Sequence, residues 1–175
     1  YAWNYAPIDA FIILNYTITN RSENTIENLY AGFWADASVA NFNYTDYYTP
    51  GGGFNWYDNL NGYDITEDDL GFSRDIAYQY DADGDDNYSE SYIGISYIGG
   101  TVPTQIVQSF YNQWKWNTSF IDEYPGYTMP ENDLSRYEKL SNSVVPRPGE
   151  SGYTRDGYPA DDDSWMLLLS AGPLG

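Results

Sequence analysis

The sequence contains neither histidine nor cysteine among its 175 residues. Catalytic systems of the Ser-His-Asp and Cys-His type, ordinary zinc and transition-metal sites, disulfides and thiol switches all need an imidazole or a thiolate. The sequence therefore excludes these classes of site. Any chemistry would have to use carboxylates, tyrosines and hydroxyl groups.

Basic residues are also scarce. Seven Lys and Arg side chains stand against 26 Asp and Glu side chains, which gives a formal net charge of -19. Proteins bind nucleic acids and anionic membrane surfaces by neutralising phosphate groups with Lys and Arg. The sequence also has no run of about 18 apolar residues, the length that crosses a bilayer. We therefore predict no nucleic-acid partner and no membrane span.

Aromatic residues are abundant, with 20 Tyr and 6 Trp in the chain. Disordered acidic chains have few aromatics, so this composition indicates a folded protein. The length suits a single domain over residues 1–175, because a chain of this size can bury a substantial core. The chain starts at Tyr1 without a charged and then apolar leader, which is typical of a mature or excised segment.

Alternation of apolar and polar residues is the clearest pattern. It predicts a half-buried strand over residues 11–19, in which one face carries Ile12, Leu14, Tyr16 and Ile18. Turn-forming residues follow at 20–24. A second apolar run over residues 26–35 then completes a predicted hairpin.

Further elements follow along the chain. Residues 76–80 and 92–98 predict a strand pair around an acidic loop, and residues 165–169 predict a fully apolar strand. Residues 130–140 predict a helix, with Pro in its first turn, acidic residues near its start and a lysine near its end. Residues 105–114 are compatible with either a helix or a strand.

Long connections rich in Gly, Asn and Tyr separate these elements. Residues 41–63 are the most extensive, and Asn61-Gly62 within them is typical of a turn. Many short strands, polar turns and few helices predict an all-β fold. We expect an antiparallel β-sandwich, immunoglobulin-like or jelly-roll-like, with long loops and one or two short helices.

Four stretches carry a family resemblance: FIILNYTITNRSENTIENLYAGFWAD at 11–36, IAYQYDADGDDNYSESYIGISYIG at 76–99, YEKLSN at 137–142 and DSWMLLLSAGP at 163–173. In order and spacing they resemble a β-sandwich module of large secreted or cell-surface bacterial proteins of the Bacteroidetes type, which often carry a C-terminal sorting domain. The resemblance implies an extracellular module with no activity of its own, placed beside catalytic or adhesive domains.

The same resemblance implies one more strand after the last stretch, beyond Gly175. Without that strand the sheet would keep an open edge, and open edges recruit strands from neighbouring chains. We therefore expect contacts between sheet edges, made with neighbouring domains or with copies of the same protein.

The best candidate ligand site is the acidic loop over residues 81–90. Alternate carboxylates in a tight loop, together with one further downstream, are the oxygen ligands that calcium prefers. The predicted calcium ligands are Asp81, Asp83, Asp85 and Glu90. A solvated acidic hairpin tip is the alternative, because the match to an EF-hand is incomplete: glycine falls at position 4 and Tyr92 at position 12.

Five Asn-x-Ser/Thr triplets are candidate glycosylation sites: Asn15, Asn20, Asn43, Asn87 and Asn117. Several tryptophans could stack on sugars or fill the core, namely Trp3, Trp34, Trp56, Trp114 and Trp116. Strand tyrosines such as Tyr16 and Tyr92 are expected to cover pleated faces with their hydroxyls in water.

These observations favour a non-catalytic, extracellular or cell-surface module with a structural or adhesive role, with calcium as its candidate cofactor. A carbohydrate-binding module is the alternative, and it would show solvent-facing aromatics in a row on one sheet face. A carboxylate glycosidase ranks well below both, because 26 acids place some pair at a suitable distance in almost any fold.

Overall fold

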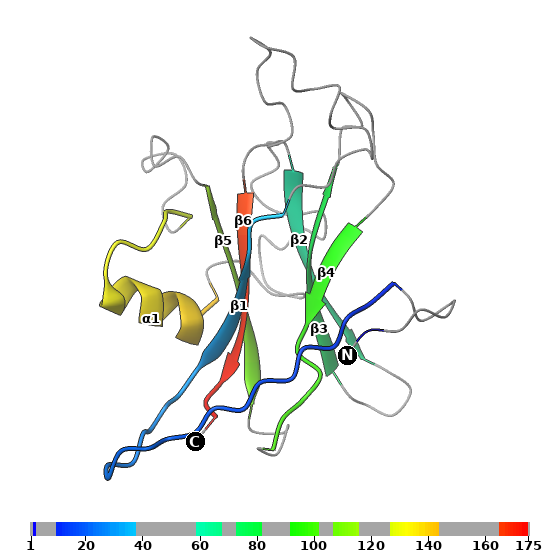
Figure 1. The fold of residues 1–175 in the computed structure, drawn as a ribbon. Coiled ribbons are helices and arrows are strands. Elements are labelled where there is room, and N and C mark those ends of the chain that lie inside the picture. Colours follow the sequence, from blue (N-terminus) through cyan, green and yellow to red (C-terminus); the bar gives the residue numbers. More distant parts are fainter. Residues whose placement is uncertain are drawn as a thin grey trace, which may run out of the picture.

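The computed structural model describes residues 2, 10–37, 59–67, 73–81, 92–101, 107–115, 127–143 and 165–174. Within these ranges the chain forms two three-stranded antiparallel sheets and one helix (Figure 1). The elements are β1 (Ala31–Ala35), β2 (Asn59–Glu67), β3 (Ser73–Asp81), β4 (Tyr92–Ser96), β5 (Gln108–Lys115), α1 (Asp133–Ser141) and β6 (Trp165–Gly172). The predicted all-β fold with a short helix is confirmed.

Strand β6 is the centre of the first sheet, whose order is β1-β6-β5. All eight of its residues are buried, which confirms the predicted apolar strand. Trp165, Leu167 and Leu169 belong to one core cluster, whereas Met166 and Leu168 belong to a second cluster with Trp114. Successive side chains of a strand point to opposite faces, so β6 separates two cores.

The second sheet has the order β2-β3-β4. The predicted hairpin around the acidic loop is confirmed, with Tyr80 opposite Tyr92 and Ile76 opposite Ser96. The expected turn at Asn61-Gly62 is wrong, because both residues lie inside β2. Gly62 serves another purpose there: it lies opposite Tyr78, and a Cβ atom at this position would overlap the tyrosine ring.

Buried polar and aromatic side chains connect the two sheets. The rings of Tyr63 and Tyr111 stack with their centroids 5.0 Å apart. Gln79 Nε2 donates to the carbonyl of Trp165 at 2.6 Å, and Asn61 Nδ2 donates to the carbonyl of Met166 at 3.1 Å. Since amides need partners when buried, these bonds fix how β2 and β3 lie against β6.

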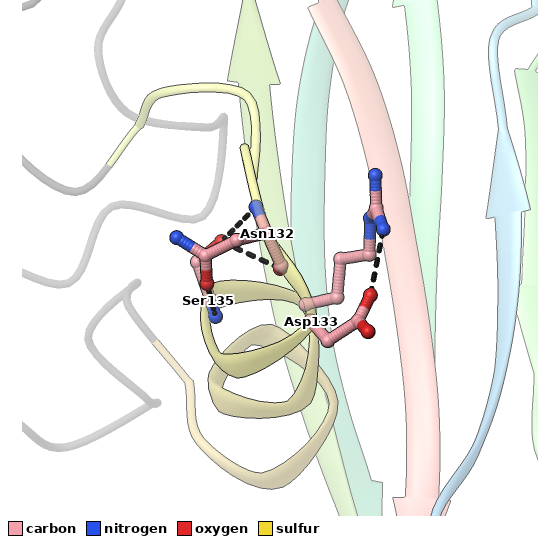
Figure 2. A network of polar contacts seen from close by, with 4 residues as sticks. Asn132, Asp133 and Ser135 are labelled. Atoms are coloured by element: carbon pink, nitrogen blue, oxygen red, sulfur yellow. Dashed lines mark hydrogen bonds and ion pairs between the residues drawn. The ribbon is translucent and has the colours of Figure 1, made fainter.

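Helix α1 confirms the helix predicted over residues 130–140. Its N-cap is Asn132, whose Oδ1 accepts from the Ser135 backbone at 3.0 Å while Ser135 Oγ accepts from the Asn132 backbone at 3.1 Å (Figure 2). Arg136 also pairs with Asp133 at 2.9 Å (Figure 2). This reciprocal capping satisfies backbone donors that the first helical turn leaves free.

The C-terminal end of α1 is attached to the first sheet by side chains of β5 and β6. Asn112 Nδ2 donates to the carbonyls of Lys139 and Asn142, both at 2.6 Å, and Ser170 Oγ donates to the carbonyl of Leu140 at 2.8 Å. A helix end leaves four carbonyls without helical partners, so these bonds stabilise it against β6. The helix is too short and too polar to cross a membrane.

Residues 105–114 were compatible with either a helix or a strand, and the structure shows a strand, β5, from Gln108 onwards. The expectation for the N-terminal hairpin is wrong in part. Residues 11–19 form no strand, apart from an isolated bridge between Ala2 and Ile12, and the second run is a strand only from Ala31.

Lys139 is the charged side chain that α1 buries, with 9% of its surface exposed. Its Nζ lies 5.9 Å from the ring centroid of Trp114. Burial removes water from the ammonium group and lowers the pKa of Lys139 from 10.5 to about 8.

We expect the stability of the wild type, relative to a Lys139→Met variant, to rise with pH. Because the pKa is about 8 in the native state and 10.5 in the unfolded state, the unfolded chain binds more protons between these values. The relative free energy of unfolding should increase by about 2 kcal/mol from about pH 7 to about pH 9.5. Urea unfolding followed by tryptophan fluorescence measures it, and tyrosine ionisation largely cancels between the two proteins.

A flat difference across this range would contradict the prediction. It would mean that Lys139 keeps an ordinary pKa in the folded protein.

Candidate functional site

The most unusual surface belongs to the arm, which we define as residues 10–30. In Figure 1 the arm runs from near the N-terminus to a tip that projects beyond the sheets, and it returns to β1. The four residues predicted to face the core are instead exposed: Ile12 69%, Leu14 52%, Tyr16 75% and Ile18 60%. The predicted half-buried strand is therefore wrong, and no described part of the chain covers these four side chains.

Part of the backbone of the arm is also without partners. Residues 14–19 make no hydrogen bond to any described residue. Backbone without hydrogen bonds presents free N–H and C=O groups that another strand can pair with.

The tip of the arm has a defined conformation. Asn20 Nδ2 donates to the carbonyl of Asn24 at 2.8 Å, and Asn20 Oδ1 accepts from the backbone of Ser22 at 2.9 Å. Ser22 Oγ also donates to Asn20 Oδ1 and to the carbonyl of Asn24. An Asn side chain that closes a turn in this way is common in tight reversals, so the predicted turn at 20–24 is confirmed.

The base of the arm is fixed to the body of the protein. The carbonyl of Asn28 accepts from the hydroxyl of Tyr137, and the carbonyl of Leu29 accepts from the backbone of Leu174 at 2.8 Å. The ring of Tyr30 packs edge-on against Phe110 and Tyr137 at 5.8 and 5.7 Å. The arm therefore projects from a firm attachment to α1, β5 and the end of β6.

Charged side chains are absent from the first half of the arm. Residues 10–20 contain no Asp, Glu, Lys or Arg, although the chain as a whole carries a net charge of -19. Mutual repulsion keeps copies of such an acidic protein apart, except where an uncharged segment projects from the body.

A second candidate surface is the tyrosine face, which we define as Tyr78, Tyr80 and Tyr92. Gln79 is buried towards β6, so Tyr78 and Tyr80 lie on the opposite face of β3. The rings of Tyr80 and Tyr92 are stacked 5.2 Å apart, and Tyr78 lies 5.8 and 6.1 Å from them. Tyr92 is 64% exposed, as expected for a strand tyrosine with its hydroxyl in water.

The sequence carried a signal for the tyrosine face that periodicity analysis alone did not assemble. Tyr78 and Tyr80 are two residues apart in β3 and therefore share a face. Tyr92, just after the acidic loop, lies opposite Tyr80 in the neighbouring strand. Only the hairpin register shows that the three rings meet.

The predicted calcium ligands lie mainly outside the described residues. Asp81 is the last residue of β3, and Asp83, Asp85 and Glu90 lie beyond the described ranges. Among the residues that the structure describes, no group of three or more acidic side chains converges on a metal position. The stacked pair Tyr80–Tyr92 does fix the two ends of this loop across the hairpin.

The candidate glycosylation sites differ in accessibility. Asn15 is exposed on the arm, whereas Asn20 uses both polar atoms of its side chain in the turn. Asn43, Asn87 and Asn117 lie outside the described residues. A glycan on Asn20 would replace the donor that closes the turn, so Asn15 is the better acceptor of the two.

The tryptophans considered for sugar stacking also divide. Trp34 is 49% exposed, but Trp114 is 6% exposed and belongs to the core. Trp3, Trp56 and Trp116 lie outside the described residues. The described tryptophans therefore do not form a row on one sheet face.

Comparison with family models, with curated proteins and with solved structures gave no match. Function is therefore inferred from the chemistry and geometry of the arm, the tyrosine face and the acidic loop.

Proposed function

We propose that this chain is a non-catalytic structural or adhesive module of a larger extracellular or cell-surface assembly. The observation that carries the proposal is the arm: its residues 10–20 contain no Asp, Glu, Lys or Arg, four of its apolar side chains are exposed, and residues 14–19 make no hydrogen bond to any described residue. A segment of this kind gains from pairing with a strand of another copy or of a neighbouring domain, which covers its apolar side chains and satisfies its backbone groups.

A sandwich of the immunoglobulin-like or jelly-roll-like kind is part of this proposal. The stacking of Tyr63 on Tyr111 and the bond from Gln79 to β6 support two sheets that pack face to face. In each sheet the outer strands pair on one side only within the described residues. Such edges are a second place where strands can be added.

Calcium binding by the loop over residues 81–90 is a further part of the proposal. Five acids in a loop whose ends are fixed by Tyr80 and Tyr92 repel one another unless a cation binds between them. A bound cation would stiffen the β3–β4 hairpin.

Carbohydrate binding is the second candidate function, and the tyrosine face is the observation that favours it. Three neighbouring rings on one sheet face offer flat apolar area with polar hydroxyl rims, which suits the apolar face of a sugar ring. The ligand would be a neutral glycan, since the acidic chain repels anionic ones.

We expect the wild type to self-associate reversibly as its concentration rises, and a Leu14→Glu/Ile18→Glu variant to associate at least about tenfold more weakly. The two glutamates place repelling charges in the contact surface, while the melting temperature should barely change because both positions are exposed. Sedimentation equilibrium measures the dissociation constant.

The matched control is Ile98→Glu, which charges an equally exposed apolar position, 73% exposed, outside residues 10–30. Self-association by this variant should equal that of the wild type. Equal weakening by both variants would contradict a role for the arm and point to non-specific charge repulsion.

We expect calcium to raise the midpoint of thermal unfolding, and excess chelator to reverse the change, because a ligand that binds only the native state stabilises it. Asp83→Ala should remove the calcium-dependent part. Asp133→Ala, which deletes an exposed carboxylate on α1, should keep it. A calcium effect no larger than that of equal ionic strength would show that the loop is a solvated tip.

For the carbohydrate alternative, binding to an array of neutral glycans should be lost in Tyr92→Ala and retained in Tyr16→Ala. Both tyrosines are exposed, at 64% and 75%, but Tyr92 alone belongs to the tyrosine face. Stacking on an aromatic ring contributes enough for its loss to weaken binding about tenfold. Equal binding by both variants would rule out the tyrosine face as the site.

A further inference from the structure

We propose that two copies of this chain associate through their arms, which pair as antiparallel strands around a twofold axis at Asn15. The inference rests on the proposed function and adds two things to it. The partner is a second copy of the chain, and two residues lie opposite each other when their numbers sum to 30.

The first support is the symmetry of the apolar pattern. In this register Ile12 of one copy lies opposite Ile18 of the other, and Leu14 lies opposite Tyr16. All four are exposed by more than half in the single chain. Directly opposed residues on an antiparallel pair share one face, so the apolar side chains of both copies form one continuous strip.

The second support is the distribution of charge. The uncharged segment, residues 10–20, is centred on position 15, and its limits also sum to 30. In the sequence it is bounded by Asp9 on one side and Arg21 on the other. The two uncharged segments overlap over their full length only in this register. The register therefore brings together the parts of the two acidic chains that repel each other least.

The third support is the unpaired backbone. Residues 14–16, which lie at the proposed axis and pair with one another in this register, make no hydrogen bond to any described residue. Antiparallel pairing uses the same groups of both copies, which gives a closed twofold contact. The tip and base of the arm are already held by their own bonds, so pairing requires little new order at either end.

The absence of natural cysteine makes a direct test available, because each introduced cysteine is the sole thiol of its chain. In Asn15→Cys the twofold register places the two thiols opposite each other, at the spacing of about 5 Å between Cα atoms that disulfides accept. We expect most of the protein to become a disulfide-linked dimer in a glutathione redox buffer. Circular dichroism and the melting temperature would show that the variant is folded.

Ile12→Cys and Ile18→Cys serve as matched controls. Each residue would lie about 20 Å from its equivalent in the other copy, so neither variant should cross-link alone. A mixture of the two, one of them carrying an affinity tag, should give the mixed dimer, because positions 12 and 18 are opposed. Non-reducing gels and mass spectrometry identify each product.

Failure of this inference is distinguishable from failure of the proposed function. If the wild type associates and Leu14→Glu/Ile18→Glu does not, but Asn15→Cys fails to cross-link, the arm pairs with a sheet edge and the arm-to-arm register is wrong. Cross-linking of Ile12→Cys alone as efficient as that of Asn15→Cys would also overturn the register. A wild type that stays monomeric at every concentration would overturn both.

Discussion

The structure depends on the complete burial of β6. This strand pairs with β1 and β5 on its two sides, faces β2 and β3 on one surface, and faces α1 on the other. Each neighbour covers apolar side chains of β6. Polar side chains add specific bonds: Gln79 of β3 bonds to the backbone of β6, and Ser170 of β6 bonds to the backbone of α1. Loss of packing at this strand would therefore affect every described element together.

The parts of the fold that the sequence predicted are those that depend on local pattern and burial alone. The apolar run of β6, the β3–β4 hairpin and the capped helix were all identifiable, because each carries a pattern that one conformation satisfies. The helix was predicted over residues 130–140, but it begins only at Asp133, because Asn132 and Ser135 form its N-terminal cap.

Other parts could not be predicted, because they depend on residues distant in the sequence. Asn61-Gly62 has the composition of a turn, but Gly62 makes room for Tyr78 and Asn61 bonds across to β6. The alternation at residues 11–19 correctly indicates a segment with one apolar face, but periodicity contains no information on whether its partner belongs to the same chain. Burial of Lys139 similarly follows from the position of Trp114, which lies on another element.

The stacked pair of Tyr80 and Tyr92 has a consequence for how this protein tolerates change. The two residues are directly opposed, so the hairpin register is set at its loop end, independently of whatever connects the strands. The connection between them can therefore be lengthened, shortened or replaced by a foreign peptide, provided that its two ends still span the distance between adjacent strands. The β3–β4 hairpin is therefore a natural position for displaying an inserted sequence, in the laboratory or during divergence.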